Sequence, residues 1–398
     1  MVVNQPAYGP LPPEGGRVGF MGIPAEGRSG PRGNTGNYVH GYAARHILGE
    51  YVNISPRKLT DAMVEEYRAS LTHLAFVTAT TLSVDNSHVE PHEDHADRIE
   101  RLGLPVVVFG LGSRAPIGQS LAEATVHPAT VRLLKVISDH TSTIAVRGAF
   151  TADLCRKLGI HNVEVIGCQS CYMSCRPDFR FPALPSAPDL SRSIVNFTRQ
   201  ARESALFEAA MAARATVIGQ ASYFEEELCK LPPVSGMEDI PEEIRSLIAP
   251  SLLRMITRRK IPIGALQDWM RDRFQQFYTV PDWFDFLARG FDFCIGTRFH
   301  GNMASLQAGI PTMWVVHDMR TQEFCDLLGL PNLPLAALQS GKPVPRLVEK
   351  HFDTSAFDRR YPENYARFHA YLERHGVPHR LAPPMTSAAQ GAAAAHPA

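Results

Sequence analysis

The chain has 398 residues and carries 40 lysines and arginines against 40 aspartates and glutamates. This length is sufficient for two domains, each with a core of its own, and the balanced charge argues against a nucleic-acid partner. No apolar run approaches the length of a membrane span, and the first 16 residues lack the apolar segment of a secretory signal. Seven cysteines without secretory context indicate reduced thiols, so we expect a cytoplasmic protein.

Short apolar runs alternate with helix-period segments from Arg17 onward, which is the pattern of a parallel sheet covered by helices. In the first half this pattern predicts strands at 18–21, 73–78, 105–109, 143–146 and 163–166. It also predicts helices at 38–48, 127–139 and 151–158.

A second series of the same kind follows a proline-rich stretch. Its predicted strands are 193–198, 215–220, 261–266, 292–296 and 312–316. Its predicted helices are 199–213, 223–230, 241–258, 267–278, 282–289, 302–308 and 361–374.

We therefore expect an α/β protein whose two Rossmann-like domains face a cleft, where such folds bind their ligands. The predicted organisation is a flexible arm at 1–16, an N-terminal domain at 17–178, a linker at 179–192, a C-terminal domain with a terminal helix at 193–380, and a disordered tail at 381–398.

The most informative segment is the turn from Gly296 to Gly301, which joins a buried strand to a helix. A strand that enters a helix in this way brings side chains and free backbone N–H groups to one place. Arg298 can hold two anionic oxygens, and His300 can move a proton near neutral pH. The turn thus indicates an anionic substrate and a proton transfer. The structural alternative is that both side chains only cap the helix.

Charged residues follow two further predicted strands. Arg147 ends the strand at 143–146, so we expect it to point into the cleft opposite Arg298 and to bind an anion, unless it forms a surface ion pair. His317, Asp318 and Arg320 leave the strand at 312–316 together, close in the chain to the His300 turn. They either contact the substrate or serve the structure only.

Two glycine turns in the first half are weaker candidates. Gly33-Asn34-Thr35-Gly36-Asn37 precedes a helix, whose N-terminus favours an anion or a hydroxyl-rich group, although a purely structural loop fits equally well. Gly110-Leu111-Gly112-Ser113-Arg114 follows a buried strand, and its polar end either faces the cleft or caps the next helix.

Two further segments raise the question of a metal. Cys168, Cys171 and Cys175 lack a clear fourth ligand, so buried structural cysteines are the favoured interpretation. The segment 88–95 holds three histidines and three carboxylates, but Pro91 interrupts any helix face, so we expect a solvated loop whose acids alternatively reach an acceptor hydroxyl. We expect no metal and no cofactor.

These segments together resemble the polysaccharide pyruvyl transferase family, from about residue 17 to about residue 330. The resemblance is carried by five motifs, the late Thr-Arg-Phe-His-Gly turn being the most specific: 33–37, 110–113, 147–160, 167–170 and 297–311. Asn37 replaces an aspartate of the family pattern, and Gln169 replaces the proline of its Gly-Cys-Pro-Ser turn. The glycine-rich turn expected after the third strand is replaced by residues 78–86.

The resemblance implies a GT-B-like fold and a transferase that moves the pyruvyl group of phosphoenolpyruvate onto a sugar of a cell-surface polysaccharide or its lipid-linked precursor, forming a ketal. It implies that Arg147, Arg298 and His300 hold phosphoenolpyruvate, with peripheral association at the inner face of the membrane left open. The candidate catalytic residues are His300 and Asp318, with an acid of 85–94 as another candidate base. The candidate substrate-binding residues are Arg147, Arg298, Thr297, Gly301, Asn302, His317, Arg320, Asn34, Asn37, Gly112 and Ser113.

Two other interpretations stay open at this point. The first is a glycosyltransferase of the same fold that uses a nucleotide sugar. The second is a catalytically inactive homologue that binds a sugar or an anion, which the replacements at Asn37 and Gln169 would allow. The oligomeric state and the acceptor sugar are not encoded in any motif that we recognise.

Overall fold

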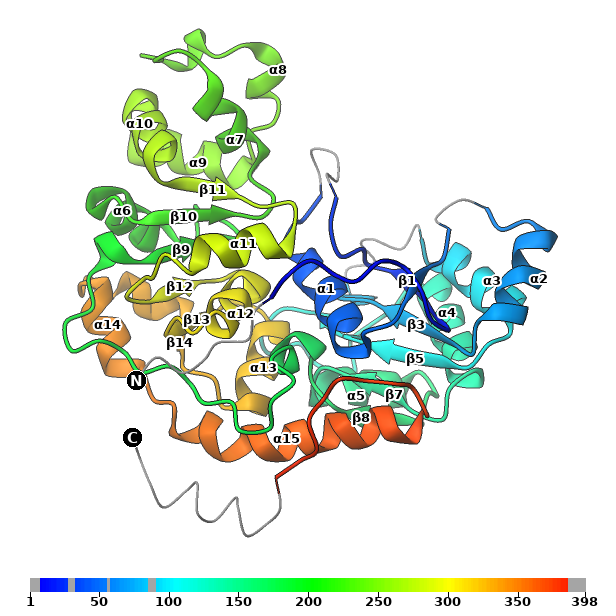
Figure 1. Ribbon diagram of the computed structural model, residues 1–398. Helices are drawn as coiled ribbons and strands as arrows, with labels where there is room; N and C mark the ends of the chain where they lie inside the picture. The colour runs from blue at the N-terminus through cyan, green and yellow to red at the C-terminus, as the bar shows by residue number, and fades with distance from the viewer. Residues whose placement is uncertain (1–7, 28–32, 56–57, 85–90, 386–398) are drawn as a thin grey trace.

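The computed structural model describes residues 8–27, 33–55, 58–84 and 91–385. Within these ranges the chain is a mixed α/β protein with parallel sheets, as the sequence predicts (Figure 1). None of the described helices combines the length and the apolar character that a bilayer crossing requires. Residues 1–7 of the predicted arm, residues 386–398 of the predicted tail and residues 85–90 of the acidic segment lie outside the described residues.

The first sheet is built from the N-terminal half of the chain. Its parallel strands lie in the order β2 (Val52–Asn53), β1 (Val18–Gly22), β3 (His73–Val77) and β5 (Val106–Phe109). A parallel pair, β7 (Ile144–Val146) and β8 (Val163–Val165), continues this layer through a bridge between Leu111 and Val146. The helices of this half are α1 (Asn37–Leu48), α2 (Asp61–Ser70), α3 (His92–Leu102), α4 (Pro128–Asp139) and α5 (Ala149–Lys157).

The second sheet has six parallel strands in a doubly wound order. The order is β11 (Phe274–Gln276), β10 (Thr216–Gly219), β9 (Ile194–Asn196), β12 (Cys294–Gly296), β13 (Thr312–Val316) and β14 (Asn332–Pro334). Numbered from β9, this is the order 3-2-1-4-5-6, which reverses direction between β9 and β12. The first sheet reverses between β1 and β3. Ligands of doubly wound sheets bind outside such reversal points.

The helices of the second half cover this sheet and extend beyond it. They are α6 (Ser204–Ala213), α7 (Tyr223–Lys230), α8 (Glu242–Arg245), α9 (Pro250–Arg259), α10 (Ile263–Arg273), α11 (Val280–Leu287), α12 (Phe299–Gln307), α13 (Met319–Leu328) and α14 (Val344–His351). The segment from α7 to α10 projects away from the rest of the molecule in Figure 1.

The last helix, α15 (Ser355–Arg374), runs along both halves of the molecule (Figure 1). Its buried aromatic residues share one core with Phe109 of β5 and with Trp314 of β13. The ring of Phe368 stacks on Tyr172 with 4.8 Å between centroids. Because this core contains side chains from both sheets, the two halves are packed together through α15.

One predicted strand of the second half is wrong. Residues 261–266 do not form a strand, because α10 begins at Ile263 directly after Pro262, which is well suited to a helix start. The strand of this region comes later, at Phe274–Gln276, inside the segment predicted as helix 267–278. A short apolar run is compatible with the period of a strand and with that of a helix, and here it forms a helix.

Three helix boundaries also differ from the prediction. The predicted helix 241–258 is divided into α8 and α9, with Pro250 at the first position of the second piece. The helix predicted from 199 begins only at Ser204. The loop predicted through 95 ends at Pro91, because this proline starts α3 instead of interrupting it.

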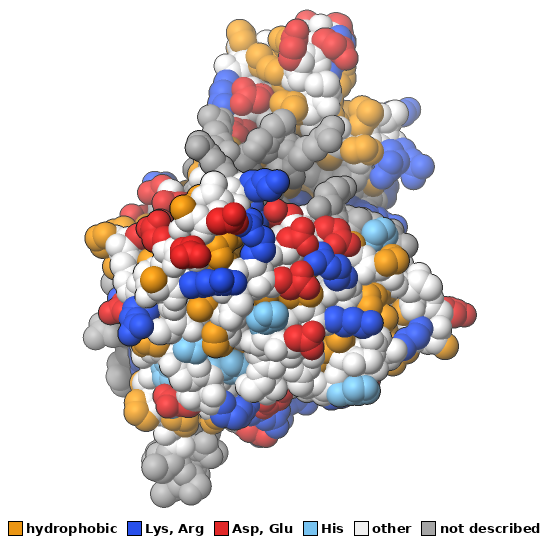
Figure 2. Space-filling model, turned by 90° about the vertical axis from the view of Figure 1, so that its right-hand side faces the viewer, with side chains coloured by type: hydrophobic (Ala, Val, Ile, Leu, Met, Phe, Trp, Pro, Cys, Tyr) orange, Lys and Arg blue, Asp and Glu red, His pale blue; other side chains and the backbone are white. Residues whose placement is uncertain are grey.

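Charged side chains of both signs are interspersed on the face that Figure 2 shows. On α3 and α4, Arg132 forms ion pairs with Glu93 at 2.6 Å, Asp97 at 2.8 Å and Glu100 at 2.6 Å. Glu93, one of the acids considered as a base, is therefore engaged by Arg132, and Asp94 pairs with Arg98 at 2.6 Å.

The hydroxyl of Tyr371 on α15 bonds to the backbone N–H and C=O of one residue in β5. It accepts from the N–H of Val108 at 2.9 Å and donates to its C=O at 3.0 Å. Tyr371→Phe should lower the free energy of unfolding by about 1–3 kcal/mol, because it removes the side-chain partner of these two buried backbone groups. Chemical denaturation measures the change.

Tyr67→Phe is the matched control, because the Tyr67 hydroxyl accepts from the Ser55 N–H in a partly exposed position where water can replace it. A cost at Tyr371 no larger than that at Tyr67 would show that the contact between α15 and β5 contributes little to stability.

Candidate functional site

A cavity of about 1260 Å³ lies at the reversal points of the two sheets. It is lined by residues that follow the carboxyl ends of strands in both halves, including Arg147 from the first half and Arg298 from the second. The charged residues that follow strands meet here for a physical reason, since parallel strands bring their carboxyl ends to one edge of a sheet.

 Six more of the predicted residues, which come from both halves of the chain, line this cavity together with these two arginines: Asn34, Asn37, His300, His317, Asp318 and Arg320.

The turn after β12 holds Arg298 in place through the neighbouring strand β9. Asn196 at the end of β9 accepts the backbone N–H of Arg298 at 2.9 Å, and the Arg298 Nε donates to the Phe197 carbonyl at 2.9 Å. Burial lowers the pKa of Arg298 to about 10, so the guanidinium remains charged at neutral pH. With Nε bound to the protein, the terminal nitrogens face the cavity.

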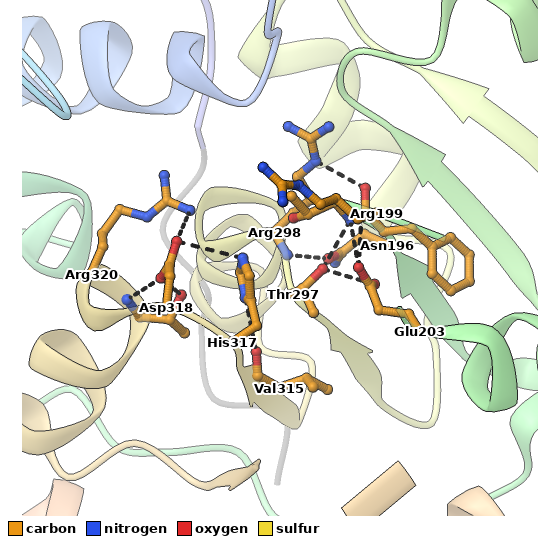
Figure 3. Close-up of polar contacts among 12 residues, drawn as sticks. Asn196, Arg199, Glu203, Thr297, Arg298, Val315, His317, Asp318 and Arg320 are labelled. Carbon is orange, nitrogen blue, oxygen red and sulfur yellow. Dashed lines mark hydrogen bonds and ion pairs between the residues drawn. The ribbon is translucent and has the colours of Figure 1, made fainter. Parts of the chain in front are cut away.

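Glu203 stabilises this turn through hydrogen bonds. Its carboxylate accepts from the Thr297 hydroxyl at 2.8 Å and from the backbone N–H groups of Thr198 at 3.2 Å and Arg199 at 2.8 Å. Burial raises the pKa of Glu203, while these donors act in the opposite direction. Figure 3 shows the network, in which the Arg199 and Arg298 side chains extend side by side away from Glu203.

His317, Asp318 and Arg320 form a second cluster after β13. Asp318 caps α13 by accepting from the Thr321 N–H at 2.8 Å, and it pairs with Arg320 at 3.0 Å and with His317 at 3.5 Å. Burial acts to raise the pKa of Asp318, but Arg320, His317 and the Thr321 donors together hold it below its usual value. Asp318 is thus an ionised carboxylate that orients two cavity side chains (Figure 3).

Arg147 is the most buried of the cavity arginines, with 1% of its surface exposed. Its Nη2 contacts the Nε2 atom of His40, and its guanidinium lies 5.2 Å from the Phe324 ring centroid. Its Nε and Nη1 atoms are buried without a hydrogen-bond partner. In the described part of the chain no carboxylate forms an ion pair with it. Burial lowers its pKa to about 10, so a largely uncompensated positive charge faces the cavity.

His300 lies beside this cation at the start of α12. The rings of His300 and His40 are 3.7 Å apart between centroids, and the Cys168 sulfur lies 3.9 Å from His300 Nε2. Burial, followed by the charges of Arg147 and Arg320, lowers the pKa of His300 well below its ordinary value. His300 is therefore neutral at pH 7 in the empty cavity. An anion beside it would favour its protonation.

His40, Cys168 and His300 are close enough to suggest three ligands of one metal ion. The charge of Arg147 argues against it. The Arg147 guanidinium, which can only donate, contacts His40 Nε2, and the Gln169 amide nitrogen lies 3.1 Å from Nδ1, so both ring nitrogens of His40 already face N–H donors. Burial also raises the pKa of the Cys168 thiol, which disfavours the thiolate that a metal would bind. Because the Arg147 charge would in addition repel a cation, these residues do not fit a metal site.

Five of the predicted substrate-binding residues do not line the cavity. The side chains of Thr297, Asn302 and Ser113 are buried and bond to Glu203, Asn196 and Thr151 respectively. The other two are Gly112 and Gly301, whose lack of a side chain leaves room for neighbouring atoms. A Cβ at Gly112 would lie 2.6 Å from the Arg147 Cδ atom, and one at Gly301 would overlap the Gln220 amide.

Several residues of the site were not predicted from the sequence. His40 does not line the cavity but contacts Arg147 from the buried face of α1, where a histidine in a helix gives no signal of its own. Arg199 and Arg202 follow β9, a strand end that was predicted but not examined for charge. Residues 78–81, noted only as a departure from the family pattern, form part of the wall in the first half.

A family model of polysaccharide pyruvyl transferase matches residues 34–319, which is more than half of the chain. The chain belongs to the polysaccharide pyruvyl transferase family. This confirms the resemblance seen in the sequence. The match spans both sheets and contains Arg147, Arg298 and His300.

Other comparisons add little. No curated protein matches the chain. Among solved structures, the apo form of the dinucleotide-forming acetyl-coenzyme A synthetase 1 of Ca. Korarchaeum cryptofilum is 13% identical, with 92% of this chain and 68% of that chain covered. Its TM-score of 0.18 carries no argument about fold or function.

The pKa of His300 has a consequence for acid stability. The unfolded chain takes up a proton at this histidine near pH 6.5, whereas the folded chain does so only at lower pH. The free energy of unfolding should therefore decrease as the pH falls below about 6.5, by up to about 1.4 kcal/mol per pH unit for each such histidine. His300→Gln should make the slope between pH 6 and pH 5 shallower by about this amount.

Denaturant titrations at several pH values measure this slope. His161→Gln is the control, because His161 is exposed and its replacement should leave the slope unchanged. An identical slope in His300→Gln and in the native protein would contradict the assignment of His300 as a buried neutral imidazole.

Proposed function

We propose that the protein transfers the pyruvyl group of phosphoenolpyruvate to a pair of hydroxyls on a sugar, forming a pyruvate ketal and releasing phosphate. The observation that carries the proposal is the buried Arg147 charge, whose Nε and Nη1 atoms lack partners at a cavity that Arg298 and Arg320 also line. Phosphoenolpyruvate brings a carboxylate and a phosphate, so arginines from both halves can bind it at once. Family membership agrees with pyruvyl transfer to a polysaccharide.

In this scheme the protein supplies charge and a proton path. The methylene carbon of phosphoenolpyruvate gains a proton, and a sugar hydroxyl attacks the resulting oxocarbenium-like carbon. The C–O bond to phosphate then breaks, and a second hydroxyl closes the ketal. Of the two hydroxyl protons, one balances the new methyl group and the other leaves on phosphate. His300 is the group best placed to move a proton once the anion has raised its pKa.

The acceptor would bind against the wall of the first half. Besides Arg114, this wall includes side chains that hydrogen-bond without carrying a fixed charge, among them Asn34, Asn37, Thr80 and Gln119. Such groups suit a hydroxyl-rich sugar. We propose a sugar of a cell-surface polysaccharide or its lipid-linked precursor, reached from the cytoplasm or at the inner face of the membrane.

We further propose that the two halves correspond to the two domains of a GT-B-like enzyme. The support is the doubly wound order of the second sheet and the cavity between the reversal points of both sheets. In this arrangement the second half would hold most of the donor, and the first half would add Arg147.

Phosphate release from phosphoenolpyruvate, measured with a panel of sugar acceptors, tests the proposed reaction. Arg298→Ala should lower kcat/KM at least about 100-fold, because it removes a charge-assisted contact to the donor. His300→Ala should lower kcat by about 100-fold or more. Mass spectrometry of the acceptor should show the added pyruvyl group.

Arg259→Ala is the control, because Arg259 lies on α9 outside the cavity and pairs with Glu208 at 3.3 Å. It should keep the native rate. Consumption of a nucleotide sugar without any response to phosphoenolpyruvate would support the glycosyltransferase instead. Binding without turnover of any donor would support an inactive homologue.

A further inference from the structure

We propose that His40 and Gln169 are positioning residues, which hold the Arg147 guanidinium so that its unpartnered nitrogens face the anionic substrate. The identity of that anion as phosphoenolpyruvate rests on the proposed function, but the positioning itself rests on the contacts below. Neither residue lines the cavity, so neither would contact the substrate.

The first contact fixes the guanidinium. Arg147 Nη2 donates to His40 Nε2, and the imidazole is fully buried. An imidazole accepts this bond only when it is neutral. Burial lowers the pKa of His40 well below its ordinary value, with the charges of His300 and Arg147 acting in the same direction, so the neutral form is present at pH 7.

The second set of contacts fixes the imidazole. The Nδ1 of His40 lies 3.5 Å from the Cys168 sulfur. The Gln169 amide nitrogen donates to the backbone carbonyl of His40 at 3.2 Å and lies 3.1 Å from His40 Nδ1. Gln169 begins a short 3₁₀ helix, Gln169–Tyr172, and is 1% exposed.

The end of β5 closes this arrangement from the other side. Gly110 has φ +75°, and a Cβ there would lie 3.2 Å from the His40 ring and 3.1 Å from the Gln169 amide oxygen. Only glycine combines that backbone conformation with so close an approach. The imidazole is thereby confined by α1, β5 and the 3₁₀ helix at once.

The consequence concerns the direction of the Arg147 charge. A carboxylate in place of His40 would neutralise the guanidinium and compete with the substrate. A neutral imidazole fixes one nitrogen and leaves the positive charge largely intact. Because Nε and Nη1 remain buried without partners, an anion that binds there relieves an existing penalty instead of displacing a protein carboxylate.

Two substitutions at one position test the role of the imidazole in the full-length protein. His40→Gln keeps an oxygen that can accept from Arg147, whereas His40→Leu has a similar size and no acceptor. We expect His40→Leu to raise the Kd and the apparent KM for phosphoenolpyruvate at least about 10-fold, and His40→Gln to stay within about 3-fold of the native values. Calorimetry and steady-state kinetics measure the two quantities. Equal effects of both substitutions would show that His40 serves packing alone.

Gln169→Ala tests the second support. It should raise the Kd for phosphoenolpyruvate about 3-fold to 10-fold, less than additively with His40→Leu. Gln322→Ala is its control, because the Gln322 amide bonds to Asp326 on the surface of α13. If His40→Leu does not fold, Gln169→Ala decides the matter, and an unchanged Kd in that variant would refute the positioning role.

A third comparison separates this inference from the proposed function. Arg147→Ala should abolish phosphoenolpyruvate binding, and His40→Leu should have no further effect in that background. Native-like binding in Arg147→Ala would refute the donor site itself. Loss of binding in Arg147→Ala combined with native-like binding in His40→Leu would leave the donor site intact and refute the positioning by His40.

Discussion

The contact between the guanidinium of Arg147 and the neutral imidazole of His40 is the interaction on which the cavity depends. Removing an arginine from water without a carboxylate partner carries a desolvation penalty of several kcal/mol, and the fold tolerates it at the reversal points of both sheets. Burial lowers the pKa of His300, and the charges of Arg147 and Arg320 act in the same direction. The same positive charges thus line the cavity and favour the neutral form of the neighbouring imidazole.

The second half also presents a positive charge to the cavity, but it holds Arg298 by different contacts. Its Nε is bound to a backbone carbonyl, and the carboxylate of Glu203 lies behind the turn, where it binds Thr297 and backbone N–H groups instead of the guanidinium. The carboxylate thereby orders the loop without neutralising the cavity. Asp318 does pair with Arg320, so the two clusters differ in how much positive charge they present.

The sequence predicted the parts of the site that depend on strand ends. Arg147, Arg298 and His300 could be predicted to lie close together, because parallel strands end at the same edge of a sheet. His40 could not, since its position depends on how α1 packs against the 3₁₀ helix, which no local pattern encodes. The prediction of a strand at 261–266 was wrong, because a short apolar run is compatible with the period of a strand and with that of a helix. Pro262 favours the start of a helix here.

The helix α15 makes the completion of the core depend on the last part of the chain. Its aromatic side chains fill space against β5 in the first half and β13 in the second, and its Tyr371 hydroxyl bonds to the backbone N–H and C=O of one residue in β5. During synthesis the N-terminal half emerges long before residues 355–374 exist. Until then the core that joins the two halves lacks the aromatic side chains of α15, so it can be completed only after residues 355–374 have been made.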